Sequence, residues 1–197
     1  MDRRRMLNAF KSAAELGSYD EFPVLVAGIN PQVYLSRNTC PQPFYLICER
    51  DTLLVQQAGT ARVHFKHSSV LWHDLGPGDL AYVPAGTPHR FVPTTDSLVA
   101  RYKAEPAGLE GVAWYCEGCG QELDRVEWDT AEELPQEGYA RVCAAFNADE
   151  GRRTCAACGK LHPAVDLDGF RWQAIAAELR SQAAARPPSP TVVAHAS

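Results

Sequence analysis

Four of the seven cysteines in this chain are arranged as two Cys-x2-Cys pairs. The pairs are Cys116 with Cys119 and Cys155 with Cys158, and a glycine directly follows each pair. Two intervening residues let both thiolates of a pair converge on one metal from a tight turn. Four thiolates suit Zn²⁺ or a rubredoxin-type Fe ion. The spacing therefore predicts a tetrathiolate metal site, with a structural role in a segment too small to fold by hydrophobic burial alone.

A second candidate ligand, His89, ends a stretch that begins at Gly78 and has the pattern Gly-x5-Pro-x-Gly-x2-His. Strand-forming residues lead into a turn rich in proline and glycine, which would deliver the imidazole to a fixed place. The pattern resembles the second sequence motif of the cupins, small β-barrels that usually hold a metal in the barrel mouth. The alternative is a hairpin in which His89 is only hydrogen-bonded.

The elements that must position these residues can be read from periodicity. Apolar residues at helical spacing predict a short amphipathic helix from Arg5 to Leu16. From Phe22 to Tyr102 the chain is a series of short strand-like runs separated by turn residues. We therefore predict a mainly β fold: a cupin-type β-barrel (double-stranded β-helix) with an N-terminal helix and a small C-terminal four-cysteine metal segment.

The 197 residues are long enough for one sizeable domain with a small appendage. The predicted organisation is a cupin barrel with its N-terminal helix (1–104), a rubredoxin-like four-cysteine segment (105–165), a C-terminal helix (166–183) and a disordered tail (184–197). The tail is predicted from its Ala- and Pro-rich composition.

Charge and hydropathy limit the partners. The net charge of −5 argues against nucleic acid and anionic membranes. No run of about 18 apolar residues occurs, so no membrane span is predicted. The basic start of the chain is followed by mixed polar sequence rather than the apolar core of a signal peptide, which indicates a cytoplasmic protein.

The residues flanking the cysteines carry a more specific resemblance. The stretch Pro106-Ala-Gly, then Trp114-Tyr-Cys and finally Cys-Gly-Lys-Leu-His-Pro163, together with the His89 motif, resembles the bacterial 3-hydroxyanthranilate 3,4-dioxygenases over roughly residues 5 to 165. The resemblance implies a cupin with an appended rubredoxin-like iron site. It also implies a barrel Fe(II) held by two His and one Glu, with open positions for substrate and O₂.

When the functional positions of the family are compared with this sequence one by one, the chain resembles a divergent member. The family's second His falls on His89. The other positions carry residues of different chemistry: Leu46 for the first His, Thr52 for the Glu, Gln42 and Pro93 near the two substrate-carboxylate arginines, and Arg101 or Tyr102 for the substrate-orienting Glu.

The sequence also allows a barrel metal site with a different set of ligands. Glu49 or Asp51 could supply a carboxylate beside His89, and Cys40 or Cys48 could supply a thiol. The candidate barrel ligands are therefore His89, Glu49 and Asp51, for Fe(II) or another divalent metal. Arg101 and Tyr102 are the candidate substrate-binding residues.

Three functions are compatible with these residues. The first is a divergent metal-dependent oxygenase or related enzyme that acts on a small aromatic or amino acid-derived substrate. The second is a non-catalytic cupin that binds a small molecule or a protein and holds only the tetrathiolate metal. The third is an unmodified 3-hydroxyanthranilate dioxygenase. The exposed barrel edges and the N-terminal helix also suggest a homodimer.

Overall fold

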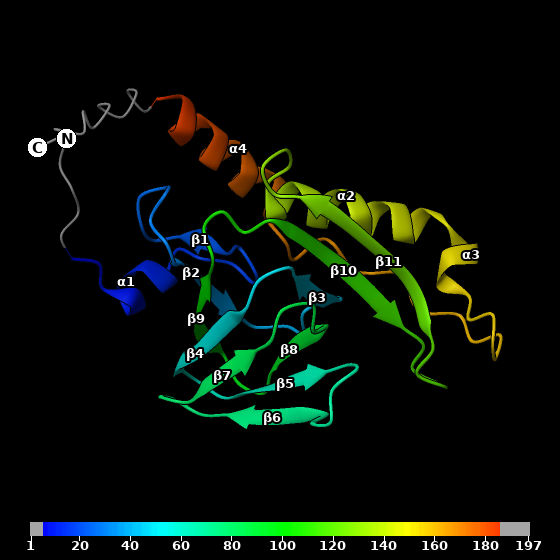
Figure 1. Cartoon of the computed structure of the whole chain (residues 1–197). Coiled ribbons are helices and arrows are strands. Elements are labelled where there is room, and N and C mark those ends of the chain that lie inside the picture. Colours follow the sequence, from blue (N-terminus) through cyan, green and yellow to red (C-terminus); the bar gives the residue numbers. More distant parts are fainter. Residues whose placement is uncertain (1–5, 186–197) are drawn as a thin grey trace, which may run out of the picture.

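The computed structural model describes residues 6–185, in which eleven strands form two antiparallel sheets (Figure 1). The five-stranded sheet has the order β1-β2-β9-β4-β7, with β1 at Phe22–Pro23, β2 at Gln32–Asn38, β9 at Ser97–Lys103, β4 at Thr52–Ala58 and β7 at Leu80–Val83. The six-stranded sheet has the order β11-β10-β3-β8-β5-β6, with β11 at Glu122–Asp129, β10 at Leu109–Tyr115, β3 at Tyr45–Cys48, β8 at His89–Pro93, β5 at Ala61–Phe65 and β6 at Trp72–Leu75. The predicted mainly β, cupin-type fold is confirmed.

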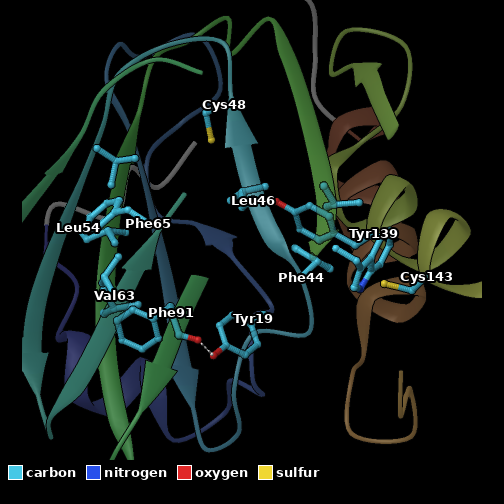
Figure 2. Close-up of a cluster of buried hydrophobic side chains, with 14 of the residues drawn as sticks. Tyr19, Phe44, Leu46, Cys48, Leu54, Val63, Phe65, Phe91, Tyr139 and Cys143 are labelled. Carbon is cyan, nitrogen blue, oxygen red and sulfur yellow. Dashed lines mark hydrogen bonds between the residues drawn. The ribbon is translucent and has the colours of Figure 1, made fainter. Parts of the chain in front are cut away.

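The barrel core lies between the two sheets. Side chains alternate along each strand, so that in β4 Thr52, Leu54 and Gln56 are buried while the residues between them are partly exposed. Figure 2 shows Leu54, Val63, Phe65 and Phe91 directed into this space, with Leu46 of β3 facing them. These apolar side chains form part of one continuous buried cluster.

Two helices extend the core beyond the barrel. The helices α2 (Pro135–Ala148) and α4 (Trp172–Ala184) lie side by side behind β10 and β11 (Figure 1). Trp114 of β10 stacks on Phe146 of α2 with ring centroids 4.0 Å apart, and its indole N–H donates to the Pro43 carbonyl at 3.0 Å. This second aromatic layer fixes the helices against the six-stranded sheet.

The helices are shorter than predicted. The helix α1 covers only Ala9–Ala13, because Asn8 caps its first turn with a side-chain hydrogen bond to Lys11 N. The C-terminal helix begins at Trp172 instead of 166, since the Asp166 side chain accepts from Asp168 N and holds the preceding residues in a turn. A short helix, α3 (Glu150–Arg153), leads into the second cysteine pair.

The sheet also crosses the expected domain boundary. The strand β10 pairs with β3 on one side and β11 on the other, so the first part of the 105–165 segment continues the six-stranded sheet. The predicted disordered tail lies outside the described residues from 186 onward. Within residues 6–185 no helix is both long and apolar enough to span a membrane.

Candidate functional site

The two cysteine pairs sit on matching turns. Cys116 follows the end of β10, and Cys155 follows α3. In each turn the first cysteine N–H donates to the carbonyl five residues on, Gln121 or Lys160, at 2.8 and 2.9 Å. The backbone carbonyls of the same cysteines accept hydrogen bonds from the N–H groups of Gly120 and Gly159 at 2.8 Å. Both glycines have positive φ. The glycine after each pair is therefore needed for the turn that orients the sulfurs.

The four thiols converge. Their Sγ atoms all lie within 4.8 Å of one another, and the closest pairs, Cys116 with Cys158 and Cys119 with Cys155, are 3.5 Å apart. A tetrahedral metal with 2.3 Å bonds places its sulfurs about 3.8 Å apart, so the cluster has the right size for one ion. The N–H groups of Cys119 and Gly118 point at the Cys116 sulfur and lower the pKa of that thiol to about 6. The donor set fits Zn²⁺ or Fe.

His89 begins β8 and is completely buried inside the barrel. Its Nδ1 lies 3.1 Å from the Thr87 carbonyl oxygen. A carbonyl only accepts, so Nδ1 carries the proton and Nε2 keeps a free lone pair. Nε2 has no hydrogen-bond partner among the described residues. Burial and the nearby Arg101 guanidinium lower the pKa of His89 to about 3, so the ring is neutral at physiological pH.

The charged residues beside His89 form a buried network. Arg101 and Lys103 of β9 contact the two oxygens of Glu21 at 2.8 and 2.9 Å. The Lys103 ammonium also contacts Glu110 of β10 at 2.8 Å, and the Tyr139 hydroxyl of α2 donates to Glu110 at 3.0 Å. The four charged side chains are at most 5% exposed. Two cations and two carboxylates leave this network neutral as a whole.

Burial and pairing act in opposite directions on these groups. Burial alone lowers the pKa of Lys103, but the carboxylates of Glu110 and Glu21 outweigh that effect and raise it. For Glu21, burial raises the pKa, and the attraction of Arg101 and Lys103 more than reverses this, so the carboxyl is ionised. The charges are thus kept in the interior by one another.

The predicted barrel carboxylates lie elsewhere. Both Glu49 and Asp51 are exposed, in the turn between β3 and β4. The Glu49 carboxylate accepts from Leu109 N at 2.7 Å, and that of Asp51 accepts from Ala85 N at 2.9 Å. Among residues 6–185, the four cysteines are the only group of three or more His, Cys, Asp or Glu side chains close enough together to hold a metal. The structure therefore does not bring Glu49 or Asp51 together with His89.

The remaining candidate residues differ in whether their side chains lie inside or outside the barrel. Arg101 points into the barrel, whereas its neighbour Tyr102 packs on the outer face against α1 and β2. The buried Cys48 is in the interior, and burial raises the pKa of its thiol to about 11, which keeps it protonated. Cys40 is partly exposed and belongs to no group of metal-binding side chains.

No family model matches the chain. Curated relatives, however, are similar to this chain over much of its length. It is 30% identical over 141 residues to "3-hydroxyanthranilate 3,4-dioxygenase 1" of Aspergillus oryzae, covering 69% of this chain and 68% of the relative. The protein of the same name from Aspergillus clavatus is 29% identical over 143 residues, or 70% and 69% of the two chains. The 3-hydroxyanthranilate 3,4-dioxygenase of Shewanella woodyi is 33% identical over 99 residues, covering 46% of this chain and 50% of that one.

The chain belongs to the 3-hydroxyanthranilate 3,4-dioxygenase family. It is a dioxygenase-like cupin. Among solved structures, a Klebsiella pneumoniae protein with a double-stranded β-helix domain superposes with a TM-score of 0.45 at 14% identity, over 57% of this chain and 99% of its own.

The barrel of this family member can be tested against the Fe(II) site that the resemblance implies. Leu46 is the direct cross-strand partner of His89, so the position expected for the first His does face the interior, but its side chain has no donor atom. Thr52 is also buried, and its hydroxyl has no partner among the described residues. Arg101 lies close enough to His89 to lower its pKa. One imidazole beside a guanidinium does not fit a divalent cation.

Sequence reasoning missed four interior residues: Glu21, Lys103, Glu110 and Tyr139. Arg101 and Lys103 share a strand face, and two cations at alternate positions in a strand between apolar neighbours could have indicated a buried ion network. Glu21 carries no such signal, because it lies in a loop 80 and 82 positions before Arg101 and Lys103.

Proposed function

We propose that this chain is a divergent dioxygenase-like enzyme whose barrel takes a small aromatic or amino acid-derived molecule. Family membership supports this proposal, since the relatives are named for the oxygenation of 3-hydroxyanthranilate. The observation that carries it is the buried His89, whose Nε2 lone pair faces the barrel interior without a partner among the described residues. A free imidazole nitrogen in an enclosed site is a ligand or hydrogen-bond acceptor.

The resident groups define what the barrel can do. His89 accepts a hydrogen bond and does not hold a proton at neutral pH. Arg101 retains an Nε–H without a partner among the described residues, so it can donate. Together they would orient a small molecule that carries both a donor and an acceptor. Because the donor set does not fit Fe(II), no step of the reaction is assigned to a barrel metal.

A second function, a cupin that binds without turnover, is favoured by one observation. The neutral network around Lys103 fills the place beside His89 with fixed charges that are already compensated. In this case the tetrathiolate metal would be the sole ion of the protein. The names of the relatives supply 3-hydroxyanthranilate as the candidate substrate for the first function and as the candidate ligand for the second.

We infer further that the tetrathiolate holds Zn²⁺ or Fe and stabilises the end of β10 against α3. The separation of the sulfurs and the paired turns support an ion there. Two Cys-x2-Cys pairs clustered as metal ligands are typical of a reducing compartment, which favours a cytoplasmic location. The exposed Trp72 and Leu80 on the edge strands of the two sheets support a homodimer, which light scattering on the purified protein would test.

The deciding experiment combines metal content with oxygen uptake. Iron and zinc per chain are measured as purified and after anaerobic Fe(II) loading, in the wild type, Cys116→Ser and His89→Ala. Oxygen consumption is then followed with 3-hydroxyanthranilate and related aromatic amino acids. Turnover that is lost in His89→Ala supports the enzyme. One metal per chain, lost only in Cys116→Ser, with no oxygen uptake for any substrate, supports the binding function and refutes the first proposal.

A further inference from the structure

The segment Ser18–Glu21 is inserted between the barrel and the two long helices. Tyr19 and Glu21 adopt positive φ values of 55° and 45°, which residues other than glycine rarely adopt. Helices α2 and α4 both hold the segment. Gln136 donates to the carbonyls of Asp20 and Glu21 at 3.1 and 3.0 Å, and the Trp172 indole N–H donates to the Tyr19 carbonyl at 3.0 Å.

The barrel wall holds the same segment from the other side. The Tyr19 hydroxyl donates to the carbonyls of Cys40 and Phe91 at 2.7 and 3.1 Å, and the second contact is drawn in Figure 2. These contacts place the Glu21 carboxylate in the interior, where Arg101 and Lys103 each bind one of its oxygens. The backbone at Tyr19 and Glu21 is thus held in an energetically unfavourable conformation, which places the Glu21 carboxylate against Arg101 and Lys103.

The two carboxylates of the network are not equivalent. Glu110 lies within β10, whose backbone is paired with β3 and with β11, so it is a permanent part of the wall. Glu21 lies in a loop next to the two-residue strand β1. Without Glu21, the remaining Arg101, Lys103 and Glu110 would carry a net charge of +1. Arg101 Nε and His89 Nε2 also lack partners among the described residues, so a larger ligand would find groups that Glu21 does not use.

We propose that Arg101 and Lys103 form a binding site for a small carboxylate in the barrel, and that Glu21 occupies this site as an internal competitor. This inference rests on the proposed small-molecule function of the barrel and names its ligand class. A carboxylate ligand would take the two contacts of Glu21 while the Ser18–Glu21 segment withdraws. Its remaining polar groups would meet the free atoms of Arg101 and His89.

Chemical rescue tests this site without reference to turnover or metal. Glu21→Ala removes the internal carboxylate and leaves space beside two buried cations. It should lower the melting temperature by roughly 10 °C. Sodium formate, acetate or benzoate should raise the melting temperature of this variant saturably, whereas sodium chloride of equal ionic strength should not. In the wild type Glu21 competes for the site, so the three carboxylates should raise the melting temperature less than in Glu21→Ala and only at higher concentration, but still more than sodium chloride does.

Two further variants distinguish carboxylate binding at this site from a general effect of salt on stability. Glu21→Gln keeps the volume and loses the charge, so it should be destabilised without rescue. Asp96→Ala removes the carboxylate of an exposed pair with Arg37 and should show neither effect. If Glu21→Ala fails to fold in chloride buffer, refolding in acetate should recover it. A folded Glu21→Ala that ignores carboxylates, or refolding that is equally poor in acetate, would overturn the proposal whether or not the protein consumes oxygen.

Discussion

The molecule has two polar centres, the four-cysteine cluster and the charged network in the barrel, which differ in how their charges are balanced. The four-cysteine cluster is assembled from two short motifs, each of which builds its own turn, and four thiolates within 4.8 Å of one another would repel unless a cation lay between them. The barrel centre gathers Glu21, Arg101, Lys103 and Glu110 from a loop and two strands, and these residues neutralise one another. The comparison shows that a protein of this family can bring together four candidate metal ligands that are local in sequence, while fixed charges surround His89 in its barrel.

The largest expected effect concerns the metal-dependent centre. Cys116→Ser removes a buried ligand, so we expect loss of the tetrathiolate ion and a fall in melting temperature of about 10 °C or more. Elemental analysis and calorimetry measure both. Cys40→Ala, at a cysteine outside the cluster, should keep the ion. Unchanged metal content in both Cys116→Ser and Cys155→Ser would contradict the tetrathiolate assignment.

The barrel centre should instead respond to loss of a charge and not to chelators. Lys103→Met leaves two buried carboxylates with one fewer cation between them, and should lower the free energy of unfolding by about 3–5 kcal/mol. Urea denaturation measures the change. The matched control is Arg37→Met, which breaks a half-exposed pair with Asp96 and should cost at most about 1 kcal/mol. Equal losses in the two variants would mean that the buried network contributes nothing special.

The pH dependence sharpens the comparison further, because the barrel holds a neutral imidazole. The pKa of His89 falls from its ordinary 6.5 to about 3 on folding. Between these values the unfolded chain binds a proton that the folded chain does not. Stability is therefore fully present above pH 6.5 and decreases as the pH falls, by up to about 1.4 kcal/mol per pH unit from this residue.

His89→Gln should remove that part of the slope, with the metal content unchanged. Denaturation curves at several pH values between 4 and 7 would measure it. Equal slopes in the wild type and His89→Gln would show that the imidazole is charged or exposed in the folded protein.

The smallest effect is expected at the two carboxylates that the sequence placed in the barrel. Because Glu49 and Asp51 are exposed and accept from backbone amides, Glu49→Gln and Asp51→Asn should each cost about 1 kcal/mol or less. Metal per chain should stay at the wild-type value in both. A drop in metal would restore these residues as ligands and would require a rearranged loop.

The sequence by itself determined the fold class and the pairing of the four cysteines in one cluster. Short runs with period-two alternation and frequent turns specify a barrel, and Cys-x2-Cys-Gly specifies a local turn whose geometry depends on few distant contacts. It also identified His89, since the proline- and glycine-rich turn fixes that side chain locally. The division of the chain at 104/105 stays a prediction, and the pairing of β10 with β3 could not be read from the sequence because it joins residues more than 60 positions apart.

Only the tertiary structure decided what surrounds His89. The inward direction of Arg101 and Lys103 follows from alternation in β9, but their compensation by Glu21 depends on a loop held by Gln136 and Trp172. Glu49 and Asp51 looked equally suitable in sequence, yet the turn between β3 and β4 carries them to the surface. Local patterns determine turns and faces, whereas the burial of a charge is determined by partners distant in the chain.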